Sequence, residues 1–132
     1  MSRANVELVE RAYRALNRHD LDGFMELCAA DVEYVNPPGA ADPGVRRGQR
    51  EFRAALQSLL DSFEDYRAEP QRMVEAGSAV VAIERSSGRG RTSGASFEVV
   101  HAHVFTIEEG KIVRFEWFPE PEEALAAGGP AE

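Results

Sequence analysis

The chain has 132 residues, of which 43% are hydrophobic and 29% are charged, and these totals are ordinary for a soluble globular domain spanning residues 1–132. Fifteen basic against twenty-three acidic residues give a net charge of −8, a field that repels a phosphate backbone and excludes nucleic acid as the expected partner. No apolar run approaches the roughly 20 residues that span a bilayer, so we expect no membrane partner. A single cysteine, Cys28, excludes an internal disulfide and indicates a reducing, cytoplasmic location.

The first part of the chain predicts two helices and a strand. Apolar residues follow i, i+3, i+7 spacing over residues 5–17, which is typical of an amphipathic helix. Asp20 is a suitable N-cap for a shorter helix that runs through Cys28, which we interpret as a small buried thiol. Residues 32–36 then form a strand, which the prolines that follow it end.

The middle of the chain predicts a long loop, a third helix and two strands. Residues 37–48 hold three prolines and three glycines, and a loop of about a dozen residues often forms the rim of a functional site. Helical spacing returns over residues 49–65, and strand character follows at 66–75 and 79–85. The glycine-rich segment 86–94 is interpreted as a hairpin tip, since no helix follows it to bind a phosphate.

Residues 97–119 predict two long strands joined at a short polar break, residues 108–111. Strand side chains alternate between faces, so one face carries Phe97, Val99, His101, His103 and Phe105. Histidines among aromatic residues on a concave sheet would make a small-molecule site. A short helix at residues 122–127 follows the hairpin.

The order of these elements defines the fold class. Helices, one strand, a helix and then four consecutive strands indicate an α+β fold rather than a doubly wound parallel sheet. A strongly bent sheet wrapped over a helix layer would leave a pocket between the two.

Three segments together resemble the nuclear transport factor 2-like superfamily, in its SnoaL-like and ketosteroid-isomerase-like branch. Residues 8–39 contain a helix, a D-L-D-G second helix, an A-x-D-V strand entry and a Pro-Gly exit; residues 46–60 resemble the third helix, and residues 104–118 the terminal strand pair with its Gly-Lys-Ile turn. The resemblance implies a cone-shaped α+β barrel. In it, a strongly curved, mostly antiparallel sheet wraps around three N-terminal helices and holds an apolar pocket, and two copies pair as a homodimer through the outer face of the sheet.

The residues that carry ketosteroid isomerase chemistry are replaced in this chain. The resemblance places Asn36 where that enzyme has its carboxylate base, and an amide cannot take a proton at neutral pH. Tyr13 lies one residue beyond the position of the catalytic tyrosine, and His103 replaces a protonated aspartate. A SnoaL-type cyclase has an acidic residue near the end of the last strand, where this chain has Trp117, with Glu116 pointing to the opposite face. These departures argue against isomerase chemistry of that type and leave the cyclase chemistry open.

The two histidines admit three interpretations. His103 can be a general acid or base because imidazole changes charge near neutral pH. It can also be a neutral core histidine that bonds Asn36, Tyr34 or a buried water. His-x-His on a strand can chelate zinc, but no acidic residue is placed on that face unless the alternation at Glu84 or Glu116 slips by one, so neither a metal nor another cofactor is expected.

We therefore expect a pocket for a small apolar or aromatic molecule, with cofactor-free acid–base chemistry of the isomerase, cyclase, hydratase or hydrolase type. His103 would carry the proton, and Asn36 with Tyr13 or Tyr34 would orient the substrate or a water. The expected substrate-binding residues are Tyr34, His101, Phe105, Phe115 and Trp117. A non-catalytic, dimeric binding or interaction module is the alternative, and the sequence leaves open whether the protein is an enzyme.

Overall fold

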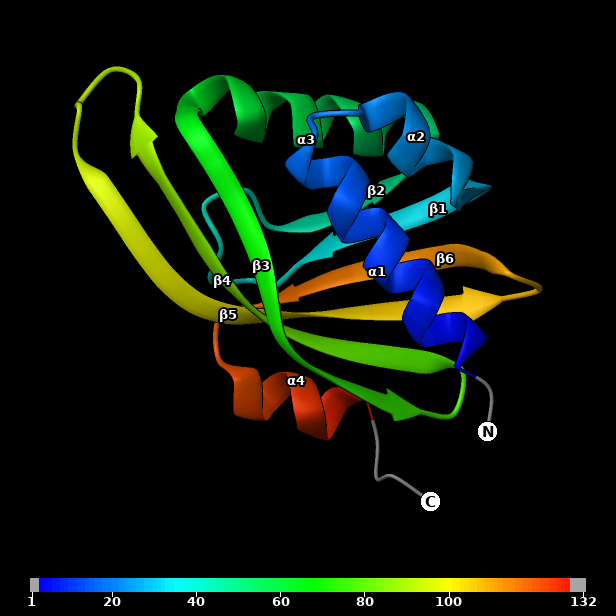
Figure 1. The fold of residues 1–132 in the computed structure, drawn as a ribbon. Coiled ribbons are helices and arrows are strands. Elements are labelled where there is room, and N and C mark those ends of the chain that lie inside the picture. Colours follow the sequence, from blue (N-terminus) through cyan, green and yellow to red (C-terminus); the bar gives the residue numbers. More distant parts are fainter. Residues whose placement is uncertain (1–2, 129–132) are drawn as a thin grey trace.

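The computed structural model describes residues 3–128 and shows an α+β fold (Figure 1). The first and last residues of the expected single domain, 1–2 and 129–132, lie outside the described residues. The helices are α1 (Ala4–Asn17), α2 (Leu21–Glu26), α3 (Gln49–Ser62) and α4 (Pro121–Ala127). The strands are β1 (Cys28–Asn36), β2 (Gly44–Arg47), β3 (Phe63–Ala76), β4 (Ala79–Gly90), β5 (Ser96–Glu108) and β6 (Lys111–Phe118).

All six strands belong to one sheet in the order β2-β1-β6-β5-β4-β3, in which only the β1–β6 pair is parallel. The sheet is curved, and α1, α2 and α3 lie on its concave face while α4 lies on the other (Figure 1). Irregularities of register between Glu64 and Arg67 and between Pro70 and Arg72 locally increase the bend of β3. Pro70 is compatible with this strand because β3 lies at the edge of the sheet. The predicted curved, mostly antiparallel sheet around N-terminal helices is confirmed.

The helix predicted at residues 5–17 is confirmed as α1, whose apolar side packs into the core through Leu8, Val9 and Leu16. The side-chain amide of Asn17 fixes the end of this helix to β3. Its Nδ2 donates to the Ala68 carbonyl, and its Oδ1 accepts from the Ala68 amide, both at 2.8 Å. Because the amide satisfies both backbone groups of one residue, it acts as a short additional strand partner and holds α1 over the concave face.

The hairpin predicted at residues 97–119 is confirmed as β5 and β6. The two residues that join the strands, Glu109 and Gly110, have φ values of 52° and 76°, and positive values at both positions are typical of a type I′ turn. In the resulting register His103 pairs with Trp117, so Trp117 is on the same face as the histidines. Glu116 points to the opposite face, as expected.

The loop expected at residues 37–48 is wrong in part, because Gly44–Arg47 form β2. This strand pairs with β1, for example through Val35 and Val45. Four residues directly after a proline are too few to display an alternating pattern, and their pairing depends on an edge of β1 that the local sequence does not reveal. The remaining loop, residues 37–43, lies at the rim of the cavity described below.

Three other predicted boundaries are corrected. Cys28 opens β1 rather than ending a helix, and α3 ends at Ser62 instead of reaching residue 65. Phe63 fits the helical spacing but has extended backbone angles, because its ring packs against Phe97 at a centroid distance of 4.7 Å. The expected hairpin tip at 86–94 is shorter, since β4 continues to Gly90 and pairs with β5 as far as Arg89 opposite Ser96.

The outer face of the sheet carries a second, smaller core. Val81, Ala102 and Val104 pack there against Ala124 of α4. None of the helices between residues 3 and 128 is long and apolar enough to cross a membrane. The helix α4 covers part of the face through which the resemblance implies a homodimer, and the homodimer stays a prediction.

Candidate functional site

A cavity of about 310 Å³ lies between the concave face of the sheet and the helices. Every residue that the sequence singled out lines it: Tyr13, Tyr34, Asn36, His101, His103, Phe105, Phe115 and Trp117. Helix α3 contributes Leu56 and Leu59, and the loop 37–43 contributes Ala40, Ala41 and Asp42 at the rim. The structure thus brings all the candidate residues together, while their chemical roles stay predictions.

At the centre of the polar part of this cavity is Glu84, which the sequence analysis did not place on this face. Glu84 pairs with His101 in the β4–β5 register, so both point inward, and only 1% of Glu84 is exposed. Its Oε1 accepts hydrogen bonds from the Tyr13 hydroxyl and from His103 Nδ1, the latter at 2.9 Å. Its Oε2 accepts from Ser86 Oγ at 2.7 Å and lies 2.9 Å from His101 Nε2. Four donors therefore converge on one carboxylate.

This arrangement keeps Glu84 ionised. Burial by itself raises the pKa of the carboxyl, but the charge of His103 and the hydrogen bonds from both histidines lower it more, so that the pKa lies well below its usual 4.5. Burial and the Glu84 charge raise the pKa of Tyr13 well above its usual 10.0. The same two causes raise the pKa of Tyr66, whose hydroxyl donates to Ser86, to about 12. Both tyrosines are therefore neutral donors around a fixed negative charge.

The hydrogen bonds of His101 define its tautomer. Trp117 Nε1, which can only donate, bonds to His101 Nδ1, so this nitrogen must be an unprotonated acceptor. The proton of the ring is then on Nε2, which lies 2.9 Å from Glu84 Oε2 and 2.6 Å from Ser86 Oγ. His101 is consequently neutral as long as the Trp117 bond is made. Both nitrogens are used inside the protein.

His103 differs from His101 because only one of its nitrogens is used. Its Nδ1 donates to Glu84, and its ring stacks on Phe115 with a centroid distance of 4.3 Å and an interplanar angle of 17°. Within residues 3–128, no hydrogen bond engages its Nε2. This nitrogen is therefore available to a molecule in the cavity. The sequence-based interpretation in which His103 bonds Asn36 or Tyr34 is wrong, because Glu84 is its partner.

Asn36 stands apart from this network at the rim side of the cavity. Its Nδ2 donates to the Asp42 carbonyl at 2.9 Å, which ties the end of β1 to the loop. Its Oδ1 is buried and is the one side-chain polar atom with no hydrogen-bond partner among the buried groups of the described chain. Buried acceptors of this kind are rare, because losing the bond to water without replacing it raises the free energy.

The sequence pattern did not place Glu84 on the concave face, and the reason is physical. Val80, Val81 and Ala82 are all buried, since the helices cover one face of β4 and α4 covers part of the other, so hydrophobicity shows no alternation there. The neighbouring residue, Arg85, points outward and pairs with Glu98 at 3.7 Å. The signal that could have identified Glu84 is the register of β4 against His101.

Metal binding finds no support in the coordination geometry of the described residues. Between residues 3 and 128, no group of three or more His, Cys, Asp or Glu side chains is placed to hold a metal ion. Glu84 lies between the two imidazoles and already accepts a hydrogen bond from one nitrogen of each.

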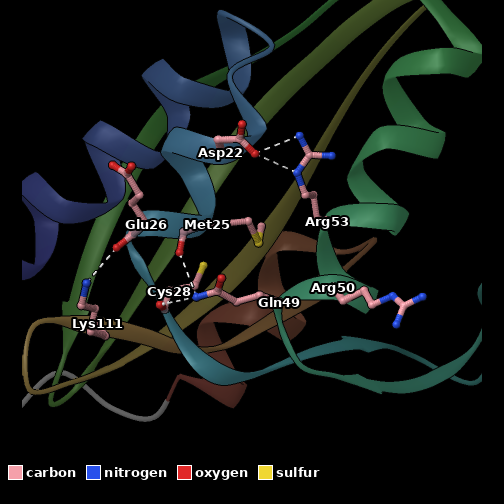
Figure 2. Close-up of a pocket in the computed structure, with 8 residues that line it drawn as sticks. All are labelled: Asp22, Met25, Glu26, Cys28, Gln49, Arg50, Arg53 and Lys111. Carbon is pink, nitrogen blue, oxygen red and sulfur yellow. Dashed lines mark hydrogen bonds and ion pairs between the residues drawn. The ribbon is translucent and has the colours of Figure 1, made fainter.

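A second hollow, of about 920 Å³, is larger but is an open groove on the surface (Figure 2). Its polar groups bond one another: Gln49 Nε2 donates to the carbonyls of Met25 and Cys28, and Arg53 pairs with Asp22 at 2.9 Å. Burial raises the pKa of the Cys28 thiol to about 12, against a smaller opposite effect of Lys111, so this thiol is neutral and unreactive. We interpret this groove as the place where α2, β1 and α3 are joined, and we assign the candidate site to the cavity between the sheet and the helices, which is less open to solvent.

The comparisons agree with this fold. The SnoaL-like domain family matches residues 9–115, and the chain belongs to this family within the nuclear transport factor 2-like superfamily. A nuclear transport factor 2-like protein from Burkholderia thailandensis is 31% identical over 96% of this chain and 98% of its own, with a TM-score of 0.78. One of unknown function from Burkholderia pseudomallei is 26% identical over 98% of this chain and 100% of its own, with a TM-score of 0.80.

A third structure comes from Catenulispora acidiphila. It is a hypothetical protein with a ketosteroid isomerase-like fold in complex with trimethylamine, 20% identical over 95% of both chains, with a TM-score of 0.77. At this identity the likeness shows the fold alone. No curated protein matched the chain.

Proposed function

We propose that the cavity binds a small, largely apolar or aromatic molecule and that His103 transfers a proton to or from it without a cofactor. The observation that carries the proposal is the bond between His103 Nδ1 and the ionised, buried Glu84, which leaves Nε2 toward a ligand. A carboxylate behind an imidazole fixes the orientation of the ring and stabilises the imidazolium that forms when the ring takes a proton.

The surrounding groups give each residue a separate part in this proposal. Tyr13, expected to orient the substrate, instead bonds Glu84, so we assign it to positioning the carboxylate. Asn36 keeps its expected part as a group that faces the ligand, and Tyr34, Phe105 and Phe115 supply apolar walls. The supported reaction types are those that need only a movable proton: isomerisation, cyclisation, hydration or dehydration. The trimethylamine bound to the Catenulispora protein supports the idea that cones of this fold hold small molecules.

Proton placement tests this proposal directly. We expect long-range proton–nitrogen correlation spectra to show the neutral His103 ring protonated at Nδ1, with Nε2 unprotonated, and the His101 ring protonated at Nε2. In Trp117→Phe the donor to His101 Nδ1 is lost, so the Nε2–H tautomer of His101 should no longer be fixed, and the Nδ1–H tautomer should appear beside it. A His103 ring protonated at Nε2 instead of Nδ1 in the wild-type protein would contradict the assignment.

A non-catalytic binding or interaction module remains the second candidate. The observation in its favour is that Tyr13, Ser86 and both histidines satisfy Glu84 completely, which is how a purely structural buried carboxylate is stabilised. Both candidate functions are compatible with the homodimer and the cytoplasmic location predicted from the sequence. Sedimentation of the purified protein would test the homodimer. The exchange assay described in the Discussion distinguishes the candidates.

A further inference from the structure

We infer that the cavity selects an uncharged ligand that carries a hydrogen-bond donor, and that Asn36 Oδ1 is the atom that receives this donor. The inference deepens the proposed function, on whose cavity it rests, but it requires no catalysis.

The polar atoms of the residues that line the cavity divide into those that already make hydrogen bonds and those that have no hydrogen-bond partner. Glu84 accepts from four donors, His101 uses both ring nitrogens, and the Trp117 indole donates to His101. These groups cannot bond a ligand without breaking a bond that they already make. Within residues 3–128, the polar atoms of the lining residues that make no hydrogen bond are the buried Asn36 Oδ1, His103 Nε2 and the Tyr34 hydroxyl.

The orientation of the Asn36 amide is fixed by its neighbour. Its other atom, Nδ2, lies 2.9 Å from the carbonyl oxygen of Asp42, and a carbonyl can only accept, so the NH₂ must be on that side. Oδ1 is therefore the acceptor left without a donor. Because a buried acceptor without a partner raises the free energy of the protein, a ligand hydroxyl or amine hydrogen in this position is favoured.

The charges of the cavity exclude anions. Within the described residues, neither lysine nor arginine lines it, and the Asp42 carboxylate at the rim already pairs with Arg46. The one available positive charge, a protonated His103, lies directly against the ionised Glu84. An anion would lose its water and gain no unmatched cation in exchange.

The walls define the rest of the ligand. The rings of Tyr34 and Phe115 are stacked at a centroid distance of 5.8 Å, and Trp117 lies beside His101 on the neighbouring part of the same wall. A volume of about 310 Å³ is at the small end of ligand cavities. A compact aromatic ring with a hydroxyl or amino substituent matches this combination of shape and polarity.

Three matched probes test the inference: para-cresol, its methyl ether and para-toluate, which share one ring and differ in carrying a donor, no donor or a negative charge. Trp117 is the single tryptophan of the chain, so its indole N–H signal reports binding in the cavity without ambiguity. We expect para-cresol to bind at least roughly tenfold more tightly than its methyl ether, and para-toluate to bind most weakly. Equal affinities, tighter binding of para-toluate, or no shift with any probe would overturn the inference.

The variant Asn36→Leu identifies the acceptor. Leucine keeps a similar volume and removes Oδ1, so the preference for para-cresol over its methyl ether should disappear. Any rearrangement of the loop through the lost Asp42 bond affects both probes alike and cancels in their ratio. If the preference survives in this variant, the hydroxyl bonds His103 Nε2 or Tyr34 instead, and the assignment to Asn36 is wrong. Binding of para-cresol without any proton exchange into a ketone would leave this inference standing and count against the proposed chemistry.

Discussion

Glu84→Ala should lower the free energy of unfolding by about 3–5 kcal/mol, because removing the shared acceptor of a buried hydrogen-bond network leaves several donors without a partner, at about 1–3 kcal/mol each. Tyr13, Ser86 and two histidines lose their acceptor at a position that is 1% exposed. Urea unfolding at neutral pH measures the change. Glu98→Ala is the matched control, since among residues 3–128 this exposed glutamate on the neighbouring strand pairs only with Arg85, and its loss should cost less than about 1 kcal/mol. Similar losses for both variants would show that the network contributes little.

The same carboxylate predicts how stability depends on pH. The pKa of Glu84 is lower in the folded protein than the usual 4.5 of an unfolded chain, so below that value the unfolded chain binds a proton that the folded protein does not. The contribution of Glu84 is therefore complete above about pH 5 and is lost as the pH falls further, through the folded pKa. We expect the free energy of unfolding to fall more steeply over this acidic range in the wild-type protein than in Glu84→Gln. Parallel curves would contradict the lowered pKa.

Residues from α1, β4 and β5 meet at this carboxylate, and the sequence could predict only some of them. The positions of His101, His103 and Trp117 could be predicted because a hairpin with a short turn fixes its own register, and alternation then assigns each side chain to a face. The inward direction of Tyr13 could be predicted from the helical period of α1. Each of these inferences uses a local rule over a short stretch of chain.

Glu84 could not be reached by such a rule. Its inward direction depends on the pairing of β4 with β5 across a connection whose length the sequence does not define, because Gly88 and Gly90 resemble loop residues but lie in a strand. The unpaired Oδ1 of Asn36 depends in the same way on β2, whose four residues gain their structure only by pairing with β1. Short strands and edge pairings are determined by tertiary contacts. The positions of the Glu84 carboxylate and of Asn36 Oδ1, on which the proposals depend, therefore could not be predicted from local sequence.

His103→Ala should abolish most of the proton transfer while leaving the fold intact. The assay follows incorporation of deuterium from deuterium oxide into a hydroxylated beta-tetralone, an uncharged ring that presents a donor to Asn36 and an exchangeable C–H to His103. We expect exchange to fall by about 10²–10⁴-fold, the usual contribution of a general acid or base. The free energy of unfolding should fall by about 1–3 kcal/mol, since Glu84 loses one of its four donors.

Two comparisons separate a catalytic role of His103 from a structural one. His19→Ala removes the third histidine of the chain, which is exposed between α1 and α2, and should exchange like the wild-type protein. Added imidazole should restore part of the exchange in His103→Ala, because the missing ring leaves a space of its own shape beside Phe115, and a purely structural histidine would show no such rescue. Wild-type exchange at the rate of buffer alone, in spite of measurable binding of the ketone, would favour the non-catalytic binding module. Since Glu84 holds Nδ1, the proton in question moves at Nε2, and His103 is the one histidine whose loss should change the exchange rate without removing the cavity.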